Sequence, residues 1–391
     1  MVTREIPFSE LLSVVIDNRG RTCPTSHEGV KLIATNCISN DALYPRYEKL
    51  RYVSQDTYDN WFRGHPDPGD LIFVCKGTPG RVAIAPDPVD FCIAQDMVAV
   101  RADRSKVNPL YLFAALRSPV VQNRIQNLHV GTMIPHFKKG DFGRLNIPVP
   151  EYEDQIGIGR IYLEISRKID INERIVDVAD QLLRSIYQDA CSHTSDSIAM
   201  SKLGSLVRKG VSASSLTGDE HYIGLEHMPR RNMWLTAWQE DAEIVSGKSA
   251  FESGDVLFGK LRPYFHKVGL ALTSGVCSTD ILVVRPVEPS RLGWLLLSLS
   301  SDEVIAHASA VSDGTRMPRT KWKDLEALDV PWPGEAQVAR MNEVVRSMGA
   351  RIQSAAGENR TLATLRDTLL PQLMSGRLRV KDAEKIVEDH V

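Results

Sequence analysis

The chain of 391 residues repeats itself, and this repeat limits the possible folds more than any other feature of the sequence. Four blocks occur twice in the same order, with copies roughly 185 residues apart, and the spacing hardly drifts along the chain. The paired blocks are Gly69-Asp70 with Gly254-Asp255, Gln95–Arg101 with Thr279–Arg285, Gly131–Pro135 with Gly314–Pro318, and Leu145–Pro150 with Leu328–Pro333. Chance similarity would not keep both order and spacing, so the sequence predicts a tandem duplication of one structural unit.

Each copy ends in a long segment whose apolar residues recur in alternating steps of three and four, which is typical of a coiled-coil seam. The seam positions are 158, 161, 165, 168, 172, 175, 179, 182 and 186 in the first copy, and 338, 341, 345, 348, 352, 355, 359, 362, 366, 369 and 373 in the second. Asn172 and Asn359 occupy a-type positions, where a buried Asn would fix the helix register; the alternative is that each lies on a solvated part of its helix. Helices of roughly 55 Å cannot bury such stripes alone, so we expect them to pair antiparallel.

Short runs of branched and aromatic residues near each Gly-Asp block predict strands, and Asn108 before Pro109 predicts the start of a helix. We therefore expect an α+β fold with two similar α/β globular domains, related by a pseudo-twofold axis and separated by a coiled-coil pair of long antiparallel helices. The expected boundaries are residues 1–152 for the first domain, 153–190 for the first helix, 191–333 for the second domain, 334–376 for the second helix and 377–391 for a C-terminal tail.

The sequence lacks the motifs that would support catalysis by this chain. The segment Asn108-Pro109-Leu110-Tyr111 comes closest to the amine-binding motif of DNA amino-methyltransferases, but it lacks the second proline of that motif. No lysine has Asp or Glu two residues before it, so the Asp/Glu-x-Lys motif of one nuclease class is absent. Neither a Walker phosphate loop nor a His-Glu-x-x-His metal motif occurs. We therefore predict a non-catalytic protein with no metal or cofactor of its own.

The distribution of cysteines and apolar residues predicts where the protein resides. The six cysteines follow no metal-ligand spacing, no apolar run approaches the roughly 18 residues that span a bilayer, and the N-terminus lacks an apolar signal core. We expect a cytoplasmic protein with reduced thiols and no membrane contact. The formal net charge is −2, so a nucleic-acid binder of this composition must concentrate its basic residues locally.

Basic residues do gather at equivalent places in the two copies. The candidates for DNA binding are Lys76, Arg81, His136, Lys138, Lys139 and Arg144 in the first copy, and Lys260, Arg262, Arg316, Arg319 and Lys321 in the second, where His266 and Lys267 lie in the same stretch. Such side chains could contact phosphates by charge and base edges by the geometry of Arg or Asn. An ordinary solvated loop is the alternative, but repetition at equivalent positions favours a DNA-binding surface.

These features together resemble the specificity subunit of a Type I restriction-modification system. The resemblance covers essentially the whole chain and rests on the duplicated blocks in their order, the long helical segment after each copy, and the terminal segment Leu369–Leu378. The two copies differ in one of these stretches: Phe137-Lys138-Lys139 in the first copy corresponds to Thr320-Lys321-Trp322 in the second. Individual contacts therefore cannot be transferred from one copy to the other.

The resemblance implies two target-recognition domains, each reading one part of a split sequence on double-stranded DNA. The helices would set the spacer between the two parts and dock two methyltransferase (modification) subunits, which supply S-adenosylmethionine binding and adenine methylation. Restriction/translocase subunits that use ATP and Mg²⁺ would join for cleavage. The catalytic motifs that this chain lacks are those that such partners would provide.

Three other interpretations remain open on the sequence. The chain could be a diverged DNA methyltransferase or nuclease that acts alone, which would bind S-adenosylmethionine as a single chain. It could be a duplicated coiled-coil scaffold that recruits proteins and never contacts DNA. It could also be the specificity subunit of another phage-defence assembly with the same fold.

Overall fold

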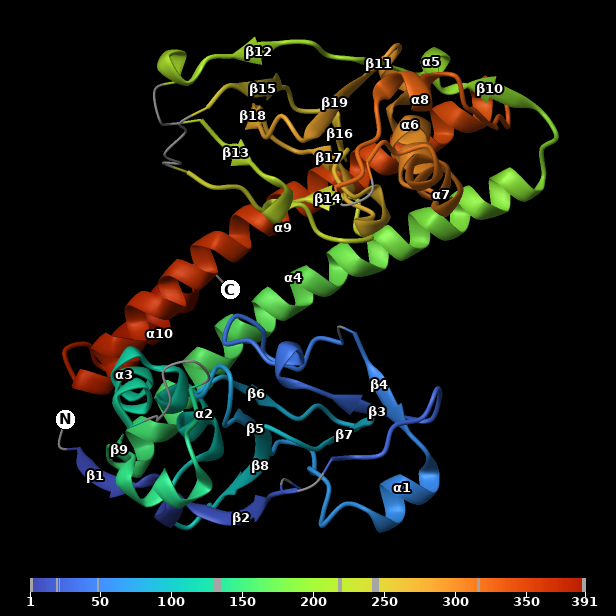
Figure 1. The fold of residues 1–391 in the computed structure, drawn as a ribbon. Helices are drawn as coiled ribbons and strands as arrows, with labels where there is room; N and C mark the ends of the chain where they lie inside the picture. The colour runs from blue at the N-terminus through green and yellow to red at the C-terminus, as the bar shows by residue number, and fades with distance from the viewer. Residues whose placement is uncertain are drawn as a thin grey trace. The chain divides into compact units, whose positions relative to one another are not determined.

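The computed structural model describes residues 3–18, 20, 22–47, 49–128, 135–216, 220–240, 246–314 and 317–388. Its contacts divide the chain into two compact units, Met1–Ile171 with Asn359–Val391 (unit 1) and Asn172–Glu358 (unit 2). Each unit contains one end of both long helices, α4 (Tyr152–Ser192) and α9 (Glu335–Ser375) (Figure 1). The prediction of an α+β chain with two similar domains and two long helices is confirmed. The domain boundaries given above stay a prediction.

Unit 1 is built around a four-stranded antiparallel sheet whose two faces are both covered. Its strand order is β2 (Leu12–Ile16), β8 (Met97–Ala102), β5 (Leu71–Val74) and β6 (Val82–Ile84). Alternate residues of β5 point to opposite sides: Leu71 and Phe73 join a core with helix α2 (Pro109–Arg117), whereas Ile72 and Val74 join a core with a second sheet. That second sheet has the order β4 (Arg51–Val53), β3 (Val30–Ile33), β7 (Phe91–Ile93). Burial of both faces explains why the central strands are apolar throughout.

Unit 2 repeats this arrangement around a five-stranded sheet. The order is β11 (Gly204–Leu206), β19 (Ile281–Pro286), β16 (Val256–Gly259), β17 (Val268–Ala271) and β14 (Trp234–Leu235). One face packs on helix α6 (Leu292–Leu299), and the other on a sheet with the order β12 (Gly210–Val211), β15 (Lys248–Phe251), β18 (Gly275–Cys277), β13 (Tyr222–Ile223). The central pairs correspond, because Val256 faces Val284 in this unit as Leu71 faces Val100 in unit 1.

Shorter elements complete the two units. The remaining α-helices are α1 (Gln55–Asn60), α3 (Pro119–Leu128), α5 (Met200–Leu203), α7 (Asp302–Ala310), α8 (Trp322–Glu326) and α10 (Val380–Glu388). Strand β1 (Arg4–Pro7) pairs with β9 (Asn146–Val149), and β10 (Ser197–Ala199) pairs with β20 (Asp329–Pro331). Short 3₁₀ helices span Phe8–Leu11, Thr35–Cys37, Lys139–Arg144, Ala213–Ser215, Leu225–His227, Pro263–Phe265 and Pro289–Arg291. None of the helices in the described part of the chain combines the length and apolar content needed to cross a bilayer.

Two sequence signals have a clear local role, and the second of them recurs in both units. Asn108 caps α2 as predicted, because its Oδ1 accepts hydrogen bonds from the amides of Leu110 at 2.9 Å and Tyr111 at 3.2 Å. The Tyr111 hydroxyl donates to the carbonyl of Pro148, and in unit 2 the Trp294 indole donates to the carbonyl of Pro331 at 2.9 Å. The repeated Pro-x-Pro motif is thus tied to the first helix after the sheet in each unit.

The ends of α4 and α9 that belong to unit 1 run antiparallel. Near the start of α4, Ile158 and Ile161 lie beside Leu373 of α9. Further along α4, the carbonyl of Ile169 accepts a hydrogen bond from Nδ2 of Asn359, an earlier residue of α9, at 3.4 Å. In unit 2 the buried Asn172 donates to Glu358 Oε2 at 2.7 Å. Both asparagines therefore lie at the helix contact within their units, and their effect on helix register stays a prediction.

The predicted seam is right for α9 and wrong at the end of α4. Every seam position of α9 is buried or half-buried, but Leu182 and Ile186 of α4 are 46% and 37% exposed. The buried residues there are Leu183 and Tyr187, so the stripe advances from Ala179 in steps of four. The reason is that this end of α4 packs on the globular part of unit 2, where Tyr187 contacts Trp294 with 4.7 Å between ring centroids. A helix on a globular surface follows its own period of 3.6 rather than a heptad.

Residues 377–391, expected as a tail, contain helix α10. Ala383 and Val387 are buried in the core of unit 1, and Arg160 of α4 forms an ion pair with Glu384. Gly157 makes this contact possible, since a Cβ at that position would overlap the side chain of Val380. The role of Gly157 could not be predicted from the sequence, because the linear order of residues does not show that Val380 approaches it.

A second glycine of α4 marks a close helix crossing, and it supports a stability prediction. An ideal Cβ at Gly159 would lie 2.6 Å from the amide nitrogen of Tyr111 in α2. We expect Gly159→Ala to lower the free energy of unfolding by about 1–3 kcal/mol, because backbone atoms cannot move aside as a flexible side chain can. The matched control is Gly357→Ala in α9, where no heavy atom lies within 4 Å of the added Cβ. That change should stabilise the helix by up to about 1 kcal/mol. Urea denaturation of both variants measures the difference, and destabilisation of equal size would contradict the close crossing.

Candidate nucleic-acid interface

The repeated Gly-Asp motif is a structural clamp at one end of two neighbouring interior strands, β5 and β8 in unit 1 and β16 and β19 in unit 2. In unit 1, Asp70 is buried, and its carboxylate accepts hydrogen bonds from Arg101 Nε at 2.8 Å and Nη2 at 2.9 Å, and from the amide of Asp67 at 2.8 Å. Gly69 has φ +86°, a left-handed conformation that favours glycine. The hydrogen bonds to Asp70 raise the pKa of Arg101.

Unit 2 builds the same clamp. Asp255 accepts from Arg285 Nε at 2.7 Å, from Arg285 Nη2 at 2.9 Å and from the amide of Glu252 at 2.8 Å, and Gly254 has φ +94°. These hydrogen bonds raise the pKa of Arg285. This block of the repeat therefore ties the ends of two neighbouring strands together, and the aspartate and arginine charges are paired within each unit.

At the opposite end of the β5–β8 pair from this clamp, three segments of unit 1 meet through backbone hydrogen bonds. The amide of Cys75 donates to Asp96 O at 2.8 Å, the amide of Gly77 donates to Pro135 O at 2.9 Å, and the amide of Phe137 donates to Cys75 O at 2.8 Å. We call residues 75–81, 95–96 and 135–139 the loop junction of unit 1. It joins the loop after β5, the turn before β8 and the segment before the 3₁₀ helix Lys139–Arg144.

The same three hydrogen bonds occur at equivalent positions of unit 2. The amide of Lys260 donates to Asp280 O at 3.0 Å, that of Arg262 to Pro318 O at 2.8 Å, and that of Thr320 to Lys260 O at 3.0 Å. Residues 260–267, 279–280 and 317–321 form the loop junction of unit 2. Because corresponding backbone atoms make corresponding bonds, the duplication preserved this junction as a scaffold while its side chains changed.

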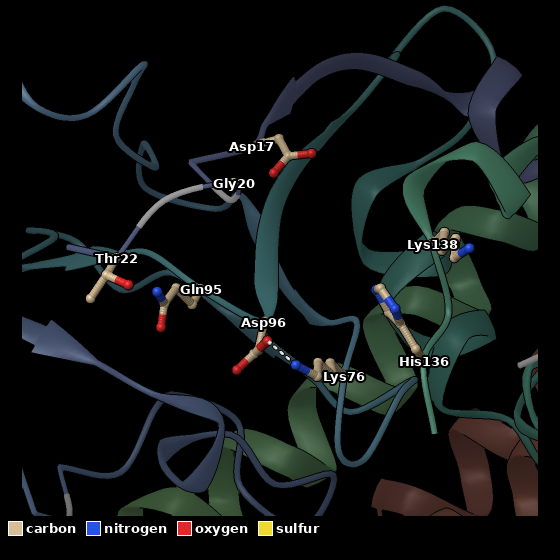
Figure 2. A pocket seen from close by; sticks show the side chains of 8 residues that line it. All are labelled: Asp17, Gly20, Thr22, Lys76, Gln95, Asp96, His136 and Lys138. Carbon is tan, nitrogen blue, oxygen red and sulfur yellow. Dashed lines mark ion pairs between the residues drawn. The ribbon is translucent and has the colours of Figure 1, made fainter. Parts of the chain in front are cut away.

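The loop junction of unit 1 lines an open depression of about 570 Å³ (Figure 2). Side chains that border it include Asp17, Thr22, Lys76, Asp96, His136 and Lys138. Lys76 Nζ lies 3.7 Å from Asp96 Oδ1, which is the ion pair drawn in Figure 2. The backbone of Lys76 pairs with that of His136, so these two predicted residues lie side by side.

Of the other predicted residues of unit 1, Lys138 borders this depression, whereas Arg81, Lys139 and Arg144 do not line it. Arg81 ends the loop after β5, and its carbonyl accepts a hydrogen bond from the amide of Val74 at 2.9 Å. Lys138 and Lys139 are exposed and form no ion pair among the residues that the structure describes. Arg144 is exposed, with Nη1 3.3 Å from Asp141 Oδ1. The structure thus brings Lys76, His136 and Lys138 together and leaves Arg144 at the far end of the 3₁₀ helix.

In unit 2 the fold adds acids that the sequence stretch itself lacks. Between Gly314 and Lys323 the sequence has basic residues and no acid. In the structure, however, Arg319 Nε lies 3.1 Å from Asp280 Oδ1, and Lys321 forms an ion pair with Asp313. The local positive charge is therefore lower than the sequence suggests, because the turn before β19 places the carboxylate of Asp280 in the loop junction. Arg316 lies outside the described residues, as do residues 131–134 of the matching block.

His266 and Lys267 do not belong to an exposed basic surface. His266 is buried, its Nε2 lies 2.8 Å from the carbonyl oxygen of Ser300, and burial lowers its pKa. Lys267 donates to the carbonyl of Leu225, and burial lowers its pKa as well.

Sequence analysis missed two exposed apolar side chains in the loop junction of unit 2. Tyr264 is 54% exposed and Met317 is 47% exposed. Charge patterns could not find them, because neither residue is charged. A tyrosine placed between Arg262 and His266 in a short loop between two strands was the available signal.

Within the described ranges, no three His, Cys, Asp or Glu side chains come close enough to hold a metal ion. The binding of S-adenosylmethionine, ATP and Mg²⁺ to partner subunits stays a prediction.

Comparison with known proteins agrees with this architecture. Residues 28–180 match the family model described as the Type I restriction modification DNA specificity domain. Over 105 residues, 26% of this chain, the sequence is 30% identical to the specificity subunit of the Type I restriction enzyme EcoDI of Escherichia coli, and the match spans 22% of the length of that relative. The crystal structure of a Type I restriction-modification S subunit from M. genitalium aligns over 95% of this chain and 96% of that chain, with a TM-score of 0.53 and 14% identity, which supports a common fold. The resemblance seen in the sequence is therefore confirmed: residues 28–180 are similar to the Type I restriction modification DNA specificity domain.

Proposed function

We propose that this chain is the DNA-specificity subunit of a Type I restriction-modification complex, and that each unit reads one half of a bipartite site on double-stranded DNA. One observation carries the proposal: the loop junction is built twice from the same three backbone hydrogen bonds, with basic but different side chains on each copy. A common scaffold with different side chains is the arrangement needed to present two different base-reading surfaces in one chain.

The chemistry of the junctions fits duplex DNA. Exposed lysines such as Lys138 and Lys139 can contact phosphates without first breaking an ion pair, which supports affinity. Arg and Gln side chains, here Arg262 and Gln95, have the donor and acceptor geometry that distinguishes base edges in the major groove. We propose that the two long helices set the spacer between the half-sites.

A further surface supports the docking of a protein partner. Val178, Leu182 and Ile186 follow one another at intervals of four along α4 and are all exposed. A contiguous apolar stripe on the exposed side of a helix is a candidate surface for binding another protein. We propose that methyltransferase subunits dock here and supply S-adenosylmethionine and adenine methylation, and that restriction/translocase subunits using ATP and Mg²⁺ join them for cleavage.

The test uses the chain assembled with its methyltransferase subunits. Random duplexes that the complex binds are selected and sequenced. We expect two short blocks of defined bases separated by a spacer of fixed length and undefined sequence. A single continuous block, or no enriched sequence, would contradict the proposal. Calorimetry with S-adenosylmethionine and the chain alone separates the stand-alone enzyme, which would bind it, from the subunit, which would not.

The docking surface leads to a prediction for Leu182→Glu. A buried charge on the apolar stripe should weaken the association with the methyltransferase subunit about tenfold or more. The fold should be unaffected because Leu182 is exposed, so the thermal unfolding midpoint should stay near that of the wild type. Gln188→Glu introduces the same charge on another exposed face of α4 and serves as the control. Surface plasmon resonance measures both affinities, and similar values for the two variants would rule out docking on this stripe.

A further inference from the structure

The loop between β16 and β17 of unit 2 holds an exposed aromatic side chain in a rigid setting. Arg262 and His266, at the two ends of the 3₁₀ helix Pro263–Phe265, have φ values of +51° and +53°. Such left-handed conformations are costly for residues other than glycine, and they persist only where the surroundings hold them. Here the amide of Arg262 is bonded to Pro318 O at 2.8 Å, and His266 Nε2 lies 2.8 Å from Ser300 O.

The result of this geometry is that Tyr264 is presented at the tip of the loop. Its ring packs edge-on against Phe265, with 4.9 Å between centroids and an interplanar angle of 71°. Phe265 is itself covered by the Arg230 guanidinium, 4.1 Å from the ring centroid. One side of the Tyr264 ring thus packs against Phe265, while more than half of the tyrosine's surface stays exposed.

The neighbourhood of Tyr264 combines apolar surface with positive charge. Met317, which precedes the carbonyl that anchors Arg262, is also exposed, and Lys260 and Arg319 belong to the same loop junction. A DNA duplex combines negatively charged phosphates with flat, partly apolar bases. It therefore complements such a surface better than a protein surface or a free phosphate would. The corresponding loop of unit 1 reads Gly77-Thr78-Pro79-Gly80 and contains no aromatic residue.

We propose that Tyr264 is a specificity-determining residue of unit 2, whose ring contacts bases of one half-site through its apolar surface, with Met317 beside it. This inference rests on the proposed function. Apolar contact with a base edge, such as the methyl group of thymine, discriminates between bases without neutralising a phosphate. The equivalent loop of unit 1 has no aromatic residue, so this contact would be specific to unit 2.

The test compares Tyr264→Ser, Tyr264→Phe and wild type, each assembled with methyltransferase subunits and bound to the duplex selected by the wild type. We expect Tyr264→Ser to lower affinity roughly tenfold or more and to relax base preference within one half-site only. The slope of affinity against salt should stay unchanged, since no phosphate contact is lost. Tyr264→Phe should retain both affinity and preference. Tyr152→Ser, which removes a tyrosine that is 47% exposed and lies outside both loop junctions, is the control and should bind as wild type.

Three results would overturn the inference. Wild-type affinity and preference in Tyr264→Ser would show that the ring does not contact DNA. A uniform loss of affinity with a shallower salt dependence would assign a phosphate contact instead, and weakened association with the methyltransferase would assign a protein contact. These outcomes leave the proposed function standing, whereas failure of the wild-type complex to select a bipartite site would overturn both.

Discussion

Asp255→Ala is expected to lower the free energy of unfolding by about 2–3 kcal/mol. The substitution removes the buried carboxylate that holds Arg285 by two hydrogen bonds and the amide of Glu252 by a third. The expected loss is below the roughly 3–5 kcal/mol of a fully buried ion pair, because Arg285 is 40% exposed and water can solvate part of it. Chemical denaturation followed by circular dichroism measures the change.

The controls are substitutions in the same clamp of unit 2 and in the equivalent clamp of unit 1. Glu252 also pairs with Arg285, at 3.0 Å, but its side chain is 57% exposed, so Glu252→Ala should cost less than about 1 kcal/mol. Asp70→Ala makes the equivalent change in unit 1 and should have an effect similar to that of Asp255→Ala. Equal losses for Glu252→Ala and Asp255→Ala would show that burial of the aspartate does not matter.

Replacing both Lys138 and Lys139 by alanine is expected to lower the DNA affinity of the assembled complex by roughly 10- to 100-fold at physiological salt. Each lost phosphate contact should reduce the slope of log affinity against log salt by about 0.9. We choose these lysines because they are exposed and, among the described residues, form no ion pair, whereas Lys76 and Arg319 are partly neutralised by Asp96 and Asp280.

The control for this prediction removes two charges elsewhere. Lys381→Ala with Lys385→Ala alters exposed lysines of α10, outside either loop junction, and should leave the salt slope unchanged. Binding is measured by fluorescence anisotropy across a series of salt concentrations. A slope that falls equally in both double variants would mean that DNA binding depends on net charge and not on the loop junction.

The large-scale organisation could be predicted because it depends on order and period along the chain. The duplicated blocks predicted two similar units, and in both of them the Gly-Asp block begins the central strand of a sheet. The seam of α9 was correct from Val338 to Leu373 because this helix buries one stripe over its whole length. The cap of α2 at Asn108 was correct because capping depends on a few adjacent residues.

Predictions failed where a residue's surroundings come from distant parts of the chain. The positive charge of the second basic stretch was overestimated because Asp280, far away in sequence, lies beside Arg319. Leu182 was assigned to the seam because its spacing fits, although the globular part of unit 2 buries Leu183 instead. Tyr264 was overlooked because the conformation that exposes it depends on hydrogen bonds that Arg262 and His266 make to the carbonyl oxygens of Pro318 and Ser300.

The amino-acid sequence by itself determined the duplication, the two long helices and the family resemblance, since each of these is a pattern of residue types at regular intervals. Only the tertiary structure decided which side chains of the loop junctions are exposed, which cations are already paired, and that α10 packs on Gly157. The physical reason is that exposure and charge pairing are set by groups that folding brings within a few ångströms, and the linear order of residues does not specify which groups these are.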